Sequence, residues 1–268
     1  MAITPEHQTS EAAALYEVRG QVAIITLNRP RALNAVNAAL STAVGTLLEQ
    51  AEADADVRVV VITGSGRAFC AGADLKALSA GESTDADGHP EWGFAGYVQH
   101  WISKPTIAAV NGFALGGGTE LVLASDLAVV DENAQLGLPE VKRGLFAAAG
   151  GVIRLQQQVP RKVALEIALT GEPITAAQGK ELGLVNRVAT AGTALDIALE
   201  LAEQIAANAP LSVRESKSMI HRTATASDWE PDVWAANAAA MKVVFTSADA
   251  QEGPLAFAQK RPAVWTGH

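Results

Sequence analysis

The chain has 268 residues, of which 49% are hydrophobic and 18% are charged, and its formal net charge is −9. This composition excludes an intrinsically disordered chain, and the length predicts one large domain or a main domain with a smaller appendage. The acidic balance and the absence of a long basic run argue against a groove for nucleic acid.

The single cysteine, Cys70, cannot form a disulfide within the chain, which is typical of a reducing compartment. No apolar run reaches the ~18 residues of a membrane span. Residues Met1 to Glu11 are polar and lack the basic and apolar segments of a secretory signal. We therefore expect a cytoplasmic protein that has no membrane partner.

Short β-rich runs alternate with glycine turns and helical patterns up to about residue 190. Strands are predicted, in chain order, at residues 22–27, 57–63, 106–110 and 126–130. A helical repeat of apolar residues follows the first strand between 36 and 51, and the third strand leads into a helix that ends near Ala124. Residues 79–93 are rich in Gly, Ser, Asp and Pro and predict a mobile loop.

The pattern is purely helical towards the end of the chain. Helices are predicted at residues 194–208, 211–221, 233–245 and 248–260, with prolines near two of the boundaries. The sequence therefore predicts an α/β core over residues 1–207 and a helical region over residues 208–268.

Several common catalytic and cofactor motifs are missing. The chain has neither a Gly-x-x-x-x-Gly-Lys-Ser/Thr phosphate loop nor a Gly-x-Ser-x-Gly nucleophile elbow. Its five histidines lack the spacing of metal ligands, so no metal site is expected. Gly64-Ser-Gly66 follows a predicted strand, but Phe69 stands where a dinucleotide-binding turn needs a small residue.

Two glycine-containing turns carry more information. Residues 69–76 follow a predicted strand, and residues 112–120 open a predicted helix. Glycine allows backbone angles that point amides away from a sheet, and the first turn of a helix has free N–H groups. If the turns meet, two N–H groups can bind one developing oxyanion; otherwise they are ordinary turns.

Two glutamates follow these motifs. Glu120 lies three residues after Gly117, on the same face of one helical turn, and Glu140 follows Pro139, which suits a first helical position. Either glutamate can be explained as an acidic residue that favours a helix start. Both have apolar neighbours, however, where an ionised side chain is costly without a function. If they face each other, repulsion and burial would push their pKa values apart, as in acid/base pairs.

At these residues the sequence resembles the crotonase superfamily, also called the enoyl-CoA hydratase/isomerase superfamily. The segments that carry the resemblance are Phe69-Cys-Ala-Gly-Ala-Asp74, Lys104-Pro-Thr-Ile-Ala-Ala-Val-Asn-Gly112, Gly116-Gly-Gly-Thr-Glu120 and Leu138-Pro-Glu140. The similarity extends over nearly the whole chain, and it is more specific to the superfamily than to one reaction. The chain is most like an enoyl-CoA hydratase, because hydratases carry both glutamates.

The resemblance implies an α/β fold, a spiral of ββα units whose helical C-terminal region builds homotrimers, often paired as homohexamers. It implies an acyl-CoA thioester substrate, no separate cofactor, and an oxyanion hole formed by the backbone amides of Ala73 and Gly117. Glu140 would donate a proton and Glu120 would activate water. Contacts to CoA and the acyl group are implied at Ala32, Leu33, Ala71, Asp74, Leu75, Lys76, Phe146 and Ala148. Phe257 and Lys260 are implied to share one helix face and to reach the CoA of a neighbouring subunit.

The chain departs from the hydratase pattern after the second glutamate. Ala147 stands where proline is usual, and Ala148 replaces a glycine that helps to hold the water. The added methyl group narrows this space, although the N–H of Ala148 remains. We expect Phe146 to shape the acyl pocket, and the segments 79–93 and 144–149 to line it. The departure argues against a straight-chain enoyl-CoA as the preferred substrate.

The leading hypothesis is the reversible hydration of a 2-trans-enoyl-CoA to a 3-hydroxyacyl-CoA, a reaction of fatty acid metabolism. A double-bond isomerase or a specialised acyl-CoA dehydratase would use the same site. A non-catalytic acyl-CoA-binding protein would not need both glutamates. A serine peptidase of the same spiral fold would need a Ser-His pair, and none is evident at the matching turns.

Overall fold

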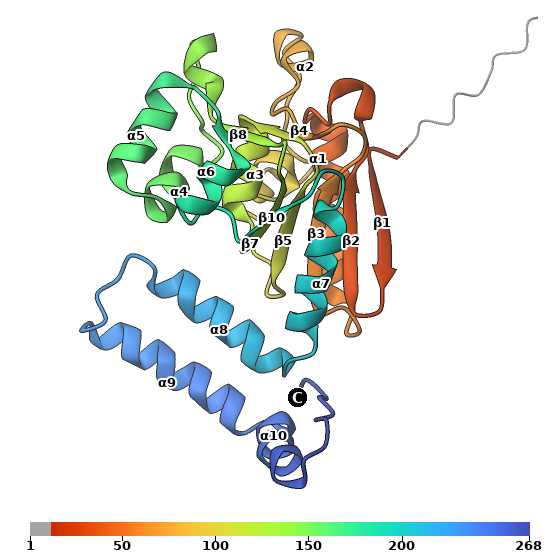
Figure 1. Ribbon diagram of the computed structural model, residues 1–268, viewed down its shortest axis with the longest axis vertical. Coiled ribbons are helices and arrows are strands. Elements are labelled where there is room, and N and C mark those ends of the chain that lie inside the picture. Colours follow the sequence, from red (N-terminus) through yellow and green to blue (C-terminus); the bar gives the residue numbers. More distant parts are fainter. Residues whose placement is uncertain (1–11) are drawn as a thin grey trace, which may run out of the picture.

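A computed structural model describes residues 12–268 of the chain. The prediction that Met1 to Glu11 carry no secretory signal therefore lies outside the described residues. The strands form two sheets, one of six strands and one of four (Figure 1). Among the described residues, no helix combines the length and the apolar character that a bilayer crossing needs.

The order of the strands shows how the chain winds. The six-stranded sheet contains, in spatial order, β1 (Ala14–Arg19), β2 (Val22–Leu27), β3 (Val59–Gly64), β5 (Thr106–Val110), β7 (Leu127–Asp131) and β10 (Arg187–Ala189). The four-stranded sheet contains β4 (Ala68–Cys70), β6 (Phe113–Leu115), β8 (Gln135–Gly137) and β9 (Ile174–Thr175). The pairs β1–β2 and β8–β9 are antiparallel, and the other pairs are parallel.

From β3 to β8, consecutive strands alternate between the two sheets. β3, β5 and β7 are neighbours in the larger sheet, and the strands that follow them, β4, β6 and β8, are neighbours in the smaller one. A helix follows each of these pairs: α2 (Leu75–Ser79), α3 (Gly117–Ala124) and a 3-10 helix (Pro139–Arg143). The predicted spiral of ββα units is therefore confirmed. Because β4, β6 and β8 are parallel, their carboxyl ends lie along one edge of the sheet.

The remaining helices of the core cover the sheets on both sides. They are α1 (Ala38–Ala53), α4 (Gly151–Gln158), α5 (Arg161–Thr170), α6 (Ala176–Glu181) and α7 (Ala194–Ala206). In β3, Val60 and Ile62 belong to the main core, whereas Val59 and Val61 face α7. A strand buried on both faces explains the continuous apolar run in the sequence. An alanine at every fourth position lets α7 approach the sheet closely: Ala194, Ala198, Ala202 and Ala206.

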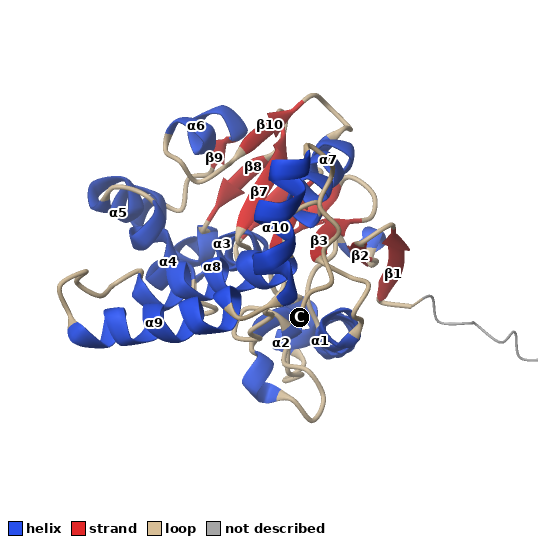
Figure 2. Ribbon diagram, turned by 90° about the horizontal axis from the view of Figure 1, so that it is seen from below, coloured by secondary structure: helices blue, strands red, loops and turns tan. Residues whose placement is uncertain are grey.

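The chain ends in three further helices, α8 (Pro210–Thr223), α9 (Pro231–Phe245) and α10 (Ala248–Gln259). Figures 1 and 2 both show α8 and α9 side by side, away from the strands. Neither α8 nor α9 contains a buried residue. The predicted helical C-terminal region is thus confirmed, whereas its division from the core as a domain at residue 208 stays a prediction.

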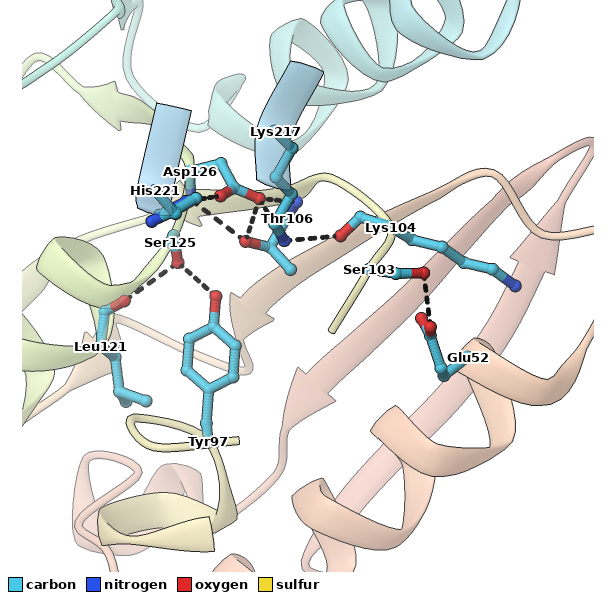
Figure 3. A network of polar contacts seen from close by, with 10 residues as sticks. All are labelled: Glu52, Tyr97, Ser103, Lys104, Thr106, Leu121, Ser125, Asp126, Lys217 and His221. Atoms are coloured by element: carbon cyan, nitrogen blue, oxygen red, sulfur yellow. Dashed lines mark hydrogen bonds and ion pairs between the residues drawn. The ribbon is translucent and has the colours of Figure 1, made fainter. Parts of the chain in front are cut away.

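One carboxylate attaches α8 to the core (Figure 3). Oδ1 of Asp126 lies 2.7 Å from Nε2 of His221, and Oδ2 lies 2.8 Å from Nζ of Lys217. The same Oδ2 accepts hydrogen bonds from the backbone N–H and the hydroxyl of Thr106. Since Lys217 and His221 are four residues apart, they lie on one face of α8. This cluster holds the helix against the start of β5 and β7.

Candidate active site

The two glycine turns meet at the carboxyl ends of β4 and β6. A Cβ added to Gly72 would lie 3.2 Å from the backbone nitrogen of Gly117 and 3.0 Å from the carbonyl oxygen of Leu115. A Cβ added to Gly118 would lie 2.0 Å from the carbonyl oxygen of Cys70. Side chains larger than glycine would therefore push the turns apart, and the glycines are what allows them to touch.

The backbone leaves two amides unused in these turns. Val36 N–H donates to the Gly72 carbonyl and Asp74 N–H donates to the Val36 carbonyl, each at 2.8 Å. This parallel bridge skips the N–H of Ala73, which finds no acceptor within residues 12–268. Gly117 is the first residue of α3. Its N–H also has no acceptor among the described residues. Adjacent free donors are what an oxyanion hole requires.

Glu120 lies in the first turn of α3 and is only 4% exposed. Its Oε1 accepts a hydrogen bond of 2.8 Å from the backbone N–H of Gly151 at the start of α4. Burial raises the pKa of Glu120 to about 7, against the opposing hydrogen bond from Gly151, and the negative charge of Glu140 acts in the same direction as burial. The two carboxyl groups therefore share one environment.

Glu140 reaches this environment from the 3-10 helix that follows β8. A Cβ added to Gly116 would lie 3.0 Å from Oε1 of Glu140, so the carboxylate lies against the turn after β6. Its Oε2 is buried and has no hydrogen-bond partner among the described residues. Burial also raises the pKa of Glu140. A buried polar atom without a partner costs ~1–3 kcal/mol, which indicates a functional position.

We expect Glu120→Gln to stabilise the fold selectively at alkaline pH. Because the folded state raises the pKa of Glu120, its contribution to stability is complete below the ordinary pKa and is lost as pH rises through about 7. A shift from 4.5 to about 7 corresponds to about 3 kcal/mol in the free energy of unfolding. Urea unfolding at about pH 5 and about pH 8 measures the difference between variant and wild type. Glu181→Gln, at an exposed position of α6, is the control. An equal difference at both pH values would contradict the prediction.

The predicted contacts from the first half of the chain lie beside this edge. Ala71 N–H donates to the Leu33 carbonyl at 3.0 Å, so the segment around Leu33 runs along the turn after β4. Asp74 caps α2 by accepting from the N–H of Lys76, and it pairs with Arg29 at 3.0 Å. Ala32, Leu33, Ala71 and Asp74 are half-buried, and Leu75 and Lys76 on α2 are exposed.

The segment after Glu140 divides its side chains between core and solvent. Ala147 is buried, and its Cβ would be 2.7 Å from a Cβ added to Gly151. It therefore packs behind the contact between Gly151 and Glu120. Phe146 is 64% exposed, and Ala148 is exposed as well.

Phe257 and Lys260 lie far from the edge formed by β4, β6 and β8 of their own chain. Figure 1 shows α10 and α2 at opposite ends of the molecule. The prediction that both residues share one helix face is wrong, because α10 ends at Gln259 and Lys260 adopts a left-handed φ of 53° as its cap. Phe257 remains on α10 and is 87% exposed.

Two residues of this environment, Gly151 and Phe94, were not predicted from the sequence. Gly151 donates to Glu120, and the pair Gly150-Gly151 before an apolar run could have indicated a helix start with free N–H groups. Phe94 places its ring against Gly117, since a Cβ added there would lie 2.3 Å from Cε1 of the ring. Nothing in the sequence indicates the contact between Phe94 and Gly117. Within residues 12–268, no group of His, Cys, Asp and Glu side chains is arranged to hold a metal ion.

Fold and site together define a spiral α/β protein in which free backbone amides, the buried Glu120 and the half-buried Glu140 surround one small volume. The family model described as Enoyl-CoA hydratase/isomerase matches residues 17–268. The chain belongs to this family, which is the crotonase superfamily and acts on acyl-CoA thioesters.

Similar proteins are named for two different substrates, enoyl-CoA and carnitinyl-CoA. A carnitinyl-CoA dehydratase of Proteus mirabilis is 42% identical over 254 residues, covering 93% of this chain and 96% of the relative. The structure of an enoyl-CoA hydratase from Mycobacterium tuberculosis H37Rv is 46% identical with a TM-score of 0.91, covering 96% of this chain and all of that chain. A carnitinyl-CoA hydratase from Mycobacterium avium is 56% identical with a TM-score of 0.77, covering 97% of this chain and all of that one. The crotonase fold is thus confirmed, and lyase chemistry on acyl-CoA is supported.

Proposed function

We propose that the protein is an enoyl-CoA hydratase, which adds water reversibly to a 2-trans-enoyl-CoA. The observation that carries this proposal is the common edge of β4, β6 and β8. It supplies two free amides, from Ala73 and Gly117, and two glutamates, the buried Glu120 and the half-buried Glu140.

The amides bind the thioester oxygen. As water adds to the β-carbon, negative charge develops on this oxygen, and N–H groups fixed in advance stabilise it without reorganisation. Loss of one such donor typically costs ~3–4 kcal/mol of transition-state stabilisation. Coenzyme A is part of the substrate, and this chemistry requires no further cofactor.

The two glutamates carry out the proton transfers. Glu120, oriented by the N–H of Gly151, takes a proton from water when it is ionised, and Glu140 in its protonated form supplies a proton to the α-carbon. Because burial raises both pKa values, one carboxyl of the pair can hold a proton near neutral pH while the other is ionised. The free Oε2 of Glu140 is available for the water and substrate.

The test is the incorporation of solvent oxygen. With trans-2-butenoyl-CoA in heavy-oxygen water, the hydratase reaction is expected to give 3-hydroxybutanoyl-CoA that carries one labelled oxygen, measured by mass spectrometry. A double variant, Glu120→Gln with Glu140→Gln, is the control for uncatalysed hydration. A product with a moved double bond and no label would identify an isomerase. Binding without turnover over a broad panel of acyl-CoAs would identify a binding protein.

A second candidate is the dehydration of carnitinyl-CoA, favoured by the relatives named carnitinyl-CoA dehydratase and hydratase. Carnitinyl-CoA is a 3-hydroxyacyl-CoA with a quaternary ammonium group, so the same glutamates would serve the reverse reaction. The alanines at 147 and 148 also favour a specialised acyl group. Comparing kcat/KM for carnitinyl-CoA and 3-hydroxybutanoyl-CoA separates the two candidates.

We also propose that the chain assembles in the cytoplasm as a homotrimer or a dimer of trimers. Large apolar side chains of the C-terminal region are exposed, among them Trp229 in the turn before α9, at 88%, and Phe245 at the end of α9, at 75%. A cavity of about 680 Å³ lies between part of α8 and the core and is lined by Leu123, Leu184, Val213 and Ile220 among others. Assembly would cover these surfaces and could bring Phe257 and Lys260 to a neighbour's CoA. A single-chain mass in analytical ultracentrifugation would contradict it.

A further inference from the structure

Phe94 lies beside the candidate oxyanion hole and has no part in the proton chemistry. A Cβ added to Gly117 would lie 2.3 Å from Cε1 and 2.4 Å from Cζ of Phe94, so the ring lies directly against the Cα of Gly117. The ring is half-buried and packs against the main core. Any acyl group whose carbonyl oxygen reaches the N–H of Gly117 therefore passes close to this ring.

The backbone that carries Phe94 is unusual. Gly93, Ala95 and Gly96 all have positive φ, at 69°, 60° and 63°. A left-handed conformation is strained for alanine, and Ala95 is nevertheless completely buried. Such a conformation persists only where the surroundings fix it, and it often marks a functional segment.

Helix α1 provides these surroundings on one face. A Cβ added to Gly96 would lie 2.1 Å from the carbonyl oxygen of Ser41, and one added to Gly45 would lie 2.2 Å from the ring of Trp92. Glu49 accepts from Nε2 of His100 at 2.6 Å. Because residues 41, 45 and 49 follow each other at intervals of four, they form one face of α1 that receives the segment 92–100.

Trp92 is the centre of this contact. Its ring is stacked between the imidazoles of His89 and His100, with centroid distances of 3.9 and 4.6 Å and interplanar angles of 5°. The stack fixes the rotation of the indole over Gly45, and Trp92 stands two residues before Phe94. The position of the Phe94 ring therefore depends on the stack.

We propose that Phe94 is a specificity-determining residue that restricts the site to short-chain acyl-CoA substrates, and that Trp92 is its positioning residue. This inference rests on the proposed function. When the amides of Ala73 and Gly117 bind the thioester oxygen, the ring of Phe94 fills space beside Gly117 that an extended acyl chain needs. An apolar wall discriminates by size, because extra methylene groups find no room beyond it.

The experiment compares kcat/KM for hydration of trans-2-butenoyl-CoA and trans-2-decenoyl-CoA. The wild type is expected to prefer the butenoyl substrate, and Phe94→Ala is expected to shift the ratio towards the decenoyl substrate by at least about tenfold. Phe94→Leu keeps the core filled and is expected to shift the ratio less, in the same direction. Phe113→Ala on β6, where the ring is 38% exposed, is the matched control with an unchanged ratio.

Trp92 is tested by the same ratio. Trp92→Leu removes the stack and is expected to relax the chain-length preference in the direction of Phe94→Ala, whereas Trp92→Phe retains a stacking ring and is expected to keep it. A merely structural role for Trp92 would lower the rates on both substrates and leave the ratio unchanged, which would overturn its positioning role.

The outcomes separate this inference from the proposed function. A wild type that hydrates butenoyl-CoA, together with Phe94 variants that leave the ratio unchanged, overturns the inference alone. A wild type that hydrates both substrates equally well overturns it too. A wild type that hydrates neither overturns the proposed function and this inference with it.

Discussion

Glu120→Gln and Glu140→Gln are each expected to lower the hydration of a short enoyl-CoA by at least ~10² while the fold persists. An amide at position 140 cannot give a proton to the α-carbon. The amide oxygen of a glutamine at position 120 can still accept the hydrogen bond from the N–H of Gly151. The amide cannot, however, take a proton from water. The loss therefore comes from proton transfer and appears mainly in kcat.

Three measurements make this test sharp. The double variant is expected to lose far less than the product of the two single losses, because both glutamates act on one water. The wild-type kcat/KM for hydration is expected to fall as pH rises through about 7, since the pair of glutamates then loses the one proton that hydration must supply to the α-carbon. The exposed Glu181→Gln variant should keep wild-type rates. Wild-type rates in both single active-site variants would show that Glu120 and Glu140 are not the proton-transfer groups.

The strands that could be predicted are those with continuous apolar runs between turn residues. Residues 22–27 and 106–110 were predicted with the bounds of β2 and β5, because both strands are almost completely buried. β1 has no such signal: it is an edge strand that exposes Leu15 and Val18 and contains the charged Glu17 and Arg19. The short helix α2 was missed because five residues are too few for a helical period.

Spacing and composition predicted the parts of the site, whereas only the resemblance to the family implied that these parts come together. Glycine turns and acidic residues in apolar settings are visible in the sequence, whereas their meeting depends on the parallel order of β4, β6 and β8, which no local spacing encodes. The contact of Phe94 with Gly117 is equally long-range. The error at Lys260 has a local cause. The helix closes with Lys260 and Arg261 donating to Phe257 and Ala256, a cap that normally uses glycine, and no glycine marks it here.

Gly118→Ala is expected to abolish most activity through the backbone alone. The new methyl group would lie 2.0 Å from the carbonyl oxygen and 2.9 Å from the carbonyl carbon of Cys70. Backbone atoms cannot rotate away as the end of a side chain can, so the start of α3 must move from the end of β4. That movement separates the N–H of Gly117 from the N–H of Ala73, and no change of side-chain chemistry is involved.

Loss of simultaneous binding by both amides is expected to lower kcat by about 10²–10³. Steady-state kinetics, run well below the melting temperature of the variant, measures this loss, and circular dichroism shows that the fold persists. The matched control is Gly253→Ala, also within a helix, where the added Cβ would make an ordinary contact of 3.4 Å with the ring of Trp265. Both variants add one methyl group to a helical glycine, but only the methyl group at position 118 would collide with the backbone beside the oxyanion hole. A Gly118→Ala enzyme with wild-type kcat would show that the two turns need not touch for catalysis.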